Sequence, residues 1–399
     1  MTASEAMKRA SLYLTMGSLA AALFSIAICH AMLALSVAAL LASGEKLRLP
    51  PIKLPLILFM ALTLVSLALS DDPAAGRPQI RKFFVFLTLL VVSSCVRDLF
   101  QMRALVLIWS AVATLSSTYA LAQFQRKVEG ARAGGYDFYQ FYVADRITGF
   151  MGHWMTFAGE MMIVLLLLAA LLLFGGRVGY RWALAGGGVL IAAAIVLSFT
   201  RSVWPGVAAG GIYLLWHWRR RALLALPVLA AVCFLAAPAS LRTRVVSAFQ
   251  PNGQLDSNQH REVLRATGWR MIRAHPLFGV GPMMVKEKFL EFIPPDAPRP
   301  VPNAWWYEHL HNTYVHYAAE RGVPAALALL WLMGKALWDF ARAAPVVREG
   351  AFIVRGAIAV ILGVLVGGLW EVNLGDSEVL GMFLATVSCG YTAIEAERG

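Results

Sequence analysis

Long apolar runs separated by short polar breaks extend over almost the whole chain. Between charged residues and Pro or Gly breaks, apolar blocks of roughly 15 to 22 residues recur, which is the length of helix that crosses a bilayer. The predicted blocks are 10–28, 31–43, 54–70, 83–96, 104–124, 153–174, 182–199, 203–217, 222–237, 312–334, 352–370 and 377–394. This pattern predicts an all-α, polytopic membrane protein with about 12 transmembrane helices. Residues 10–43 are barely interrupted, so they form either one long tilted helix or two short ones.

The composition also excludes an ordinary soluble protein. Hydrophobic residues make up 59% of the chain and charged residues 15%, with a mean hydropathy of +0.65, whereas soluble domains are about a quarter charged. The net charge of +12 does not predict a nucleic-acid partner, because many basic residues flank apolar blocks, where they fix topology and contact membrane lipids. The four cysteines are isolated from one another and form no zinc or redox pattern.

The distribution of basic residues predicts the orientation of the helices. Short loops on the N-terminal side carry Lys46, Arg48, Lys53, Arg97, Arg103, Arg177, Arg181, Arg219, Arg220, Arg221, Lys335, Arg342 and Arg348. By the positive-inside rule this side is the cytoplasm, and an even number of spans places both termini there. The opposite face then holds two longer connections, about 125–152 and about 238–311. The predicted organisation is nine spans in 1–237, an outer loop region in 238–311 and three spans in 312–399.

The longer outer connection contains a predicted amphipathic helix at 257–274. The segment begins with polar capping candidates and ends just before His275 and Pro276. At about 100° per residue, one face of this helix is apolar and a neighbouring arc is cationic. The apolar face holds Val263, Leu264, Thr267, Gly268 and Met271, and the cationic arc holds Arg261, Arg265 and Arg273 with Trp269 among them.

The densest polar cluster at a predicted membrane boundary opens the tenth span. It contains His309, His311, Asn312, Tyr314 and His316. The histidine spacing matches no usual zinc helix and places no carboxylate beside the rings, so no metal is predicted. Two other hypotheses stay open: the histidines form an interfacial cluster that reaches water, or a neutral imidazole acts as general base on a hydroxyl, since its pKa lies near the operating pH.

Charged groups from other predicted spans gather at the same outer face. Arg201 lies in a turn of only a few residues, where an arginine either reaches phospholipid head groups or binds a specific anion. Arg81 lies at a second outer turn, and Glu371 and Asp376 lie at a third. Guanidinium groups match phosphate oxygens in a bidentate manner, so an arginine-rich face beside a membrane favours a lipid pyrophosphate as ligand. That chemistry needs no redox cofactor.

Three sequence motifs resemble those of a known family. The segment 309–314 (His-Leu-His-Asn-Thr-Tyr), together with 319–324 (Ala-Glu-Arg-Gly-Val-Pro), is similar to an H-N-x-Y... E-x-G-x-P signature. The segment 269–281 is similar to a W... hPlfGvG element, and 197–202 is similar to an SxSR turn. Together these motifs resemble the O-antigen ligase and polymerase superfamily, of the Wzy_C type, over roughly residues 197–325. The twelve-span layout fits the superfamily over the whole chain.

The resemblance, which is strongest to the ligases, implies a GT-C-like glycosyltransferase of the bacterial inner membrane with its active site facing the periplasm. Such a ligase moves O-antigen polysaccharide from undecaprenyl pyrophosphate to a sugar hydroxyl of lipid A-core, with inversion and with neither a metal nor another cofactor. Carried over by position, His311 would act as the base, and Arg201, Arg265 and Arg261 would bind the donor diphosphate. The residues that would support them are Asn312, Tyr314, His309, His316, Arg81 and Asp376.

Three alternatives use related chemistry. A Wzy-type polymerase takes the same donor on both sides of the reaction, and a protein O-oligosaccharyltransferase uses a Ser or Thr of a protein as acceptor. The length of 399 residues, the single long outer loop after the ninth span and the lack of a soluble C-terminal domain favour the ligase over the protein-modifying enzyme. A transporter of a lipid-linked anion would also place arginines in a membrane cavity, but the chain shows no paired short broken spans.

Overall fold

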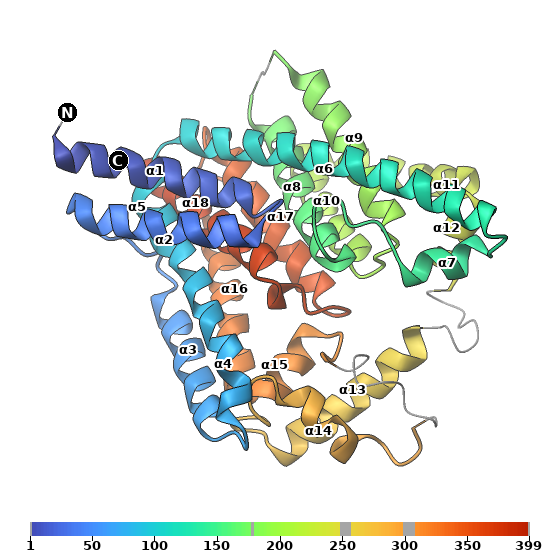
Figure 1. The fold of residues 1–399 in the computed structure, drawn as a ribbon. Coiled ribbons are helices and arrows are strands. Elements are labelled where there is room, and N and C mark those ends of the chain that lie inside the picture. The colour runs from blue at the N-terminus through green and yellow to red at the C-terminus, as the bar shows by residue number, and fades with distance from the viewer. Residues whose placement is uncertain (1, 177–178, 248–256, 298–307, 398–399) are drawn as a thin grey trace.

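The computed structural model describes residues 2–176, 179–247, 257–297 and 308–397. Within these ranges the chain forms helices and no strand (Figure 1), which confirms the predicted all-α class. The α-helices are α1 (Ala3–Ala21), α2 (Ile26–Ser43), α3 (Lys53–Ala68), α4 (Pro73–Arg81), α5 (Leu87–Cys95), α6 (Leu99–Ala133), α7 (Phe138–Ala144), α8 (Trp154–Phe174), α9 (Arg181–Leu197), α10 (Val203–Trp218), α11 (Ala225–Ala236), α12 (Ala239–Val246), α13 (Ser257–Ala274), α14 (Met284–Phe292), α15 (Thr313–Arg321), α16 (Val323–Ala343), α17 (Ala351–Gly367) and α18 (Ser377–Ala396). Short 3-10 helices occupy Lys82–Phe86, Arg220–Leu224 and Asn373–Gly375.

The N-terminal apolar stretch folds into two helices, α1 and α2, which lie side by side (Figure 1). Thr2 and Glu5 form a capping box at the start of α1. The Ser25 hydroxyl accepts a hydrogen bond from the backbone N–H of Ile28 at the start of α2. The break therefore falls earlier than the predicted boundary near residue 30, because a serine caps a helix better than the apolar residues that follow.

Six of the described helical segments are long and apolar enough to cross a membrane, judged by length and composition. They are Ile26–Ser43, Pro73–Cys95, Leu99–Ala133, Trp154–Phe174, Val323–Ala343 and Ser377–Ala396. Three shorter apolar helices are Lys53–Ala68, Arg181–Leu197 and Ala351–Gly367. These segments support a membrane protein, while the count of twelve spans stays a prediction.

The helices α8, α10, α17 and α18 pack against one another at the centre of the bundle (Figure 1). The apolar windows of α18 and α8 are 89% and 72% buried, so these helices face mainly protein rather than lipid. Gly206 and Gly210 of α10 allow its backbone to approach α17. A Cβ atom added there would lie 2.6 Å from the Gly363 carbonyl oxygen and 2.7 Å from that of Ala359, respectively. Small residues thus set the close spacing of these helices.

Several loops meet at one end of this central bundle, namely 145–153, 198–202, 309–312 and 368–376. The Thr156 hydroxyl at the start of α8 donates to the Asp376 carboxylate at 2.9 Å. The backbone N–H of Thr313 donates to the Gly368 carbonyl at 2.8 Å. The helix ends therefore hold segments that are far apart in the sequence against one another.

The amphipathic helix predicted at 257–274 is confirmed as α13, with the same bounds. Leu264, Thr267 and Met271 of its predicted apolar face are buried, while Arg265 and Trp269 are exposed. Helices α12 and α14 lie in the same predicted outer region. Residues 248–256 and 298–307 of that region lie outside the described residues.

The turn after α13 docks against the end of α15. The backbone N–H of Val280 donates to the Ala319 carbonyl, and that of Gly281 donates to the Glu320 carbonyl, both at 2.9 Å. Gly279 has φ +67°, and a Cβ atom there would lie 2.4 Å from the carbonyl carbon of Glu320. A glycine is required at this position by both the backbone conformation and the close approach.

Candidate active site

His311 lies in a backbone conformation that non-glycine residues rarely adopt. Its φ is +46°, and the next residue, Asn312, is the N-cap of α15. Asn312 accepts the backbone N–H of Val315 through Oδ1 and donates to the Leu369 carbonyl through Nδ2, both at 2.9 Å. Strained backbone persists only where surrounding contacts hold it, and it is found preferentially at functional sites.

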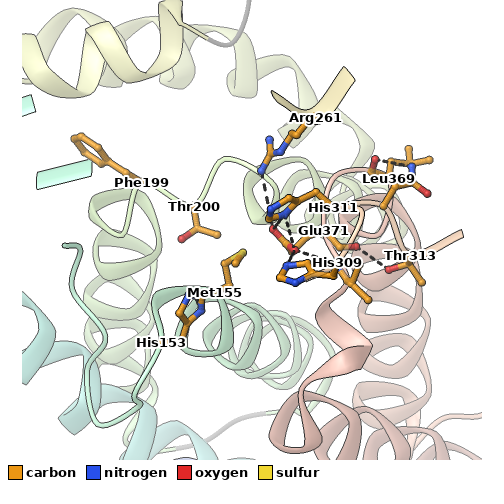
Figure 2. Close-up of polar contacts among 12 residues, drawn as sticks. His153, Met155, Phe199, Thr200, Arg261, His309, His311, Thr313, Leu369 and Glu371 are labelled. Atoms are coloured by element: carbon orange, nitrogen blue, oxygen red, sulfur yellow. Dashed lines mark hydrogen bonds and ion pairs between the residues drawn. The ribbon is translucent and has the colours of Figure 1, made fainter. Parts of the chain in front are cut away.

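The Glu371 carboxylate is the centre of the polar cluster, and the imidazole rings of His309 and His311 both point toward it (Figure 2). His311 Nδ1 lies 3.0 Å and His309 Nε2 lies 3.3 Å from its oxygens. The backbone N–H of Val372 donates to the same carboxylate at 3.0 Å, and a guanidinium nitrogen of Arg261 lies 4.0 Å away. The Glu371 side chain is only 3% exposed, so these partners rather than water compensate its charge.

The charges and hydrogen bonds of the cluster favour an ionised Glu371 carboxylate beside the rings of His309 and His311. Burial by itself would raise the pKa of the Glu371 carboxyl, but the charges and hydrogen bonds of His311 and His309 hold it well below its usual value. Burial would lower the pKa of His309, but the hydrogen bond and charge of Glu371 outweigh it and raise that pKa. Each group thereby stabilises the charged form of the other.

This arrangement can act as a general base on a hydroxyl group. A carboxylate bonded to Nδ1 fixes the imidazole tautomer and leaves Nε2 of His311 as the nitrogen with a lone pair. The same carboxylate stabilises the imidazolium that forms when Nε2 takes a proton. The His311 side chain is 19% exposed, whereas its carboxylate partner is buried. His311 is thus the member of the pair that a substrate can reach.

The same three side chains, His309, His311 and Glu371, could also hold a metal ion, since their ligand atoms all lie within 4.8 Å of one another. In the structure both rings instead lie at hydrogen-bonding distance from the carboxylate. The nearby Arg261 guanidinium adds a positive charge that would repel a cation. These contacts favour the hydrogen-bonded arrangement.

Arg201 lies in a second strained turn, 198–202, between α9 and α10. Phe199 in this turn has φ +54°. The Arg201 side chain is buried and donates from a terminal guanidinium nitrogen to the Ser247 hydroxyl at 3.0 Å. Figure 2 shows Phe199 and Thr200 in the same region as His153 and the histidine pair. Of the two sequence hypotheses for Arg201, burial against α12 favours a specific anion site over reaching lipid head groups.

Asp376 and Tyr314 contact neighbouring helices at the same end of the bundle. Asp376 accepts a hydrogen bond from Thr156, and burial raises the pKa of its carboxyl. The Tyr314 hydroxyl donates to the Leu365 carbonyl of α17. Both residues therefore hold helix ends together around the cluster.

The predicted residues His316, Arg265 and Arg81 lie apart from the histidine cluster. His316 is buried in α15, where its Nε2 lies 3.8 Å from Glu320 Oε1. Arg265 on α13 and Arg81 at the end of α4 are exposed. In the part of the chain that the structure describes, no hydrogen bond or ion pair joins them to the cluster. Their roles remain predictions.

Glu371 is the residue of the candidate site to which the sequence assigned no role. It follows His311 by 60 residues, and only an acidic group at a predicted outer turn signalled it. Its position depends on α17 ending beside α15, where the Thr313 hydroxyl donates to the Glu371 carbonyl at 2.7 Å. A contact across that separation has no local sequence pattern.

The fold and the cluster define a helical membrane protein with a carboxylate-held histidine at the ends of its helices. Residues 186–330 match the family model described as O-Antigen ligase, Wzy_C. This match supports the superfamily of O-antigen ligases and polymerases, and hence an enzyme in general terms. It includes Arg201 and His311, while Glu371 lies beyond it. No curated protein matches the chain.

Proposed function

We propose that this protein is an O-antigen ligase of the WaaL type, a glycosyltransferase of the bacterial inner membrane. It transfers O-antigen from undecaprenyl pyrophosphate to a sugar hydroxyl of lipid A-core at the periplasmic face, with both termini in the cytoplasm. The observation that carries the proposal is the Glu371-held imidazole of His311 within a protein that matches the O-antigen ligase family.

In this proposal His311 Nε2 accepts the proton of the acceptor hydroxyl as that oxygen attacks the anomeric carbon of the donor sugar. The bond to the lipid pyrophosphate breaks on the opposite side, so the anomeric configuration inverts. Glu371 stabilises the imidazolium through Nδ1. His309 shares the carboxylate and adds to the positive charge beside it.

The departing diphosphate is assigned to the arginines of the same face. Arg201, Arg261 and Arg265 are the residues that the resemblance assigns to this role. Guanidinium groups stabilise negative charge as it develops on a leaving phosphate, and they do so most strongly where water is excluded. The burial of Arg201 and the position of Arg261 beside Glu371 agree with this role.

A Wzy-type polymerase is the alternative that shares this family match. Both reactions need a base for the acceptor hydroxyl and cations for the diphosphate, so the acceptor alone distinguishes them. A protein acceptor would indicate an O-oligosaccharyltransferase. Movement of the lipid-linked donor without bond cleavage would indicate a transporter.

The test is a transfer assay with purified protein, undecaprenyl-pyrophosphate-linked glycan and lipid A-core. We expect a lengthened core and one released undecaprenyl pyrophosphate per transfer, with an equal rate after treatment with a chelator. Donor that is extended on itself would instead establish a polymerase. Loss of activity in the chelator, restored by a divalent metal, would refute the metal-independent mechanism and assign the metal to His309, His311 and Glu371.

A further inference from the structure

A buried arginine of α12 holds the strained turn that carries Arg201. Arg244 donates through Nε to the Phe199 carbonyl at 3.1 Å and lies 3.4 Å from the Tyr139 hydroxyl. The Tyr139 and Ser247 hydroxyl oxygens are 3.3 Å apart, and Ser247 also accepts from Arg201. Two hydroxyl groups therefore bridge the guanidinium groups of Arg244 and Arg201.

A further arginine, Arg146, lies in the loop that contacts the same turn. The next residue, Ile147, donates its backbone N–H to the Tyr142 hydroxyl, which donates to the Leu197 carbonyl just before the turn. The Arg146 guanidinium donates to the Val143 carbonyl at 3.2 Å and sits 4.9 Å from the centre of the Trp154 ring. Burial, followed by the positive charges of Arg244 and the other nearby arginines, lowers the pKa of Arg146. Neutral groups and like charges thus surround this side chain.

Two carboxylates at this end of the bundle, Asp145 and Glu371, already have other partners. Asp145, next to Arg146, pairs with Lys127 at 2.5 Å. Glu371 is held by the histidine pair. Among the residues that the structure describes, neither Arg146 nor Arg244 forms an ion pair with a carboxylate. Like charges gathered out of water repel one another, and a multivalent anion would remove that repulsion.

We propose that Arg146 and Arg244, together with Arg201, bind the diphosphate of a polyprenyl-linked donor. This inference rests on the proposed function and adds two binding residues that the family motifs do not contain. Arg146 lies outside the segment that matches the family, and Arg244 lies outside the motifs that resemble those of the family. Three guanidinium groups suit the many oxygens of a diphosphate better than the single phosphate of a phospholipid.

The test measures binding of farnesyl diphosphate, a short polyprenyl diphosphate, to purified full-length protein. We compare wild type with Arg146→Gln and Arg244→Gln, and we use Arg242→Gln as the matched control. Arg242 lies on the same helix as Arg244 but is exposed, so its loss removes one positive charge without touching the cluster. Each cluster variant should raise Kd about tenfold or more, and the control should leave it nearly unchanged.

Two outcomes would overturn the inference. One is that both cluster variants fold and bind farnesyl diphosphate with the same Kd as wild type. The other is an equal loss of phosphatidylglycerol binding in the same variants, together with effective competition by that lipid against farnesyl diphosphate. This result would make the cluster a phospholipid head-group site. If Arg244→Gln unfolds through loss of its bond to Phe199, Arg146→Gln decides the question, because it leaves that turn intact.

The transfer assay separates this inference from the proposed function. If diphosphate binding depends on the arginines but wild-type protein does not modify lipid A-core, the binding site is supported and the ligase function is refuted. Normal transfer to core by wild type, with cluster variants that bind diphosphate normally, would leave the ligase standing and refute the assignment of Arg146 and Arg244.

Discussion

Two histidines that are five residues apart, His311 and His316, each lie near a glutamate, and the two pairs differ in what surrounds them. His311 is bonded through Nδ1 to Glu371 at 3.0 Å, and its side chain is partly exposed. His316, five residues later, lies 3.8 Å from Glu320 and is buried, and its Nδ1 has no hydrogen-bond partner among the described residues. The first pair has a well-formed bond and an accessible ring, whereas the second has neither.

The Glu320 carboxylate instead serves the docking of the turn after α13. It accepts the backbone N–H of Met283 at 2.7 Å, where Met283 has φ +67°. Arg321 donates to it at 3.1 Å and places its guanidinium 4.6 Å from the Tyr317 ring centre. Every strong contact of this carboxylate is therefore with structural groups.

The comparison separates two histidines of one family-like segment, His311 and His316, by their surroundings. The His311 side chain, just before the start of α15, is partly exposed, whereas His316 is buried within that helix. In the proposed mechanism only His311 takes part in the chemistry. Burial and bond geometry, rather than residue type, separate the two roles. The following changes test that separation.

The largest expected effect is that of His311→Ala, which removes the proposed base. We expect the transfer rate to fall about 10³-fold with donor binding nearly unchanged, because general-base catalysis contributes in that range. Transfer kinetics and a separate donor-binding measurement check this. His217→Ala is the matched control and should keep the wild-type rate, because His217 is exposed in the last turn of α10. A His311→Ala protein with wild-type turnover would refute the assignment.

A smaller loss is expected for Glu371→Gln. The amide keeps the shape of the side chain but no longer stabilises an imidazolium, so kcat should fall about 10²-fold with KM little changed. Glu371→Asp retains the charge and should recover part of the rate. Steady-state kinetics of both variants give the answer. A rise in KM alone would mean that Glu371 acts in substrate binding and not in orienting His311.

Glu320→Gln should affect stability and leave turnover within about threefold. Removing one member of a buried charge pair costs about 3 kcal/mol, since Arg321 is left uncompensated. Thermal unfolding measures the loss. Glu308→Gln is the control, because Glu308 is exposed and its pair with Lys286 contributes little. A hundredfold loss of kcat in folded Glu320→Gln would show that the second pair is catalytic after all.

The smallest expected effect is a pH dependence of stability from His309. Its pKa is raised in the folded state, so the stabilisation it provides is complete below the unfolded value of about 6.5 and is lost as pH rises through the folded value. The Tm difference between wild type and His309→Asn should therefore be larger at about pH 6 than at about pH 9, by under about 3 °C. An equal difference at both pH values would contradict the coupling to Glu371.

The sequence predicts the fold where signals are local. The bounds of α13 follow from polar residues at its start and from Pro276 after its end, and its buried face follows from helical periodicity. The predicted boundary between α1 and α2 was wrong, because Ser25 lies inside a long apolar stretch and its hydroxyl cap on Ile28 is seen only in the folded structure. The sequence contains a local signal for both boundaries, but the apolar residues around Ser25 make the second signal hard to recognise.

In the candidate site, too, some residues could be predicted from the local sequence and others could not. His309 and His311 lie together in the sequence, so their clustering could be predicted. Glu371 and Arg244 could not be assigned, because their contacts depend on how distant helices pack. Glu371 reaches the rings only after α17 is packed against α10 and α18. Distances set by helix packing have no counterpart in residue spacing.

The position of Glu371, between α17 and α18, has a consequence during synthesis of the protein. Chains are synthesised from the N-terminus, so both imidazoles leave the ribosome well before the carboxylate that orients them. The last helical hairpin must be inserted before the base is held in place. In the proposed mechanism the nascent chain is therefore inactive until Glu371 is in place, and a truncation before Glu371 should leave the histidines without the carboxylate that orients them.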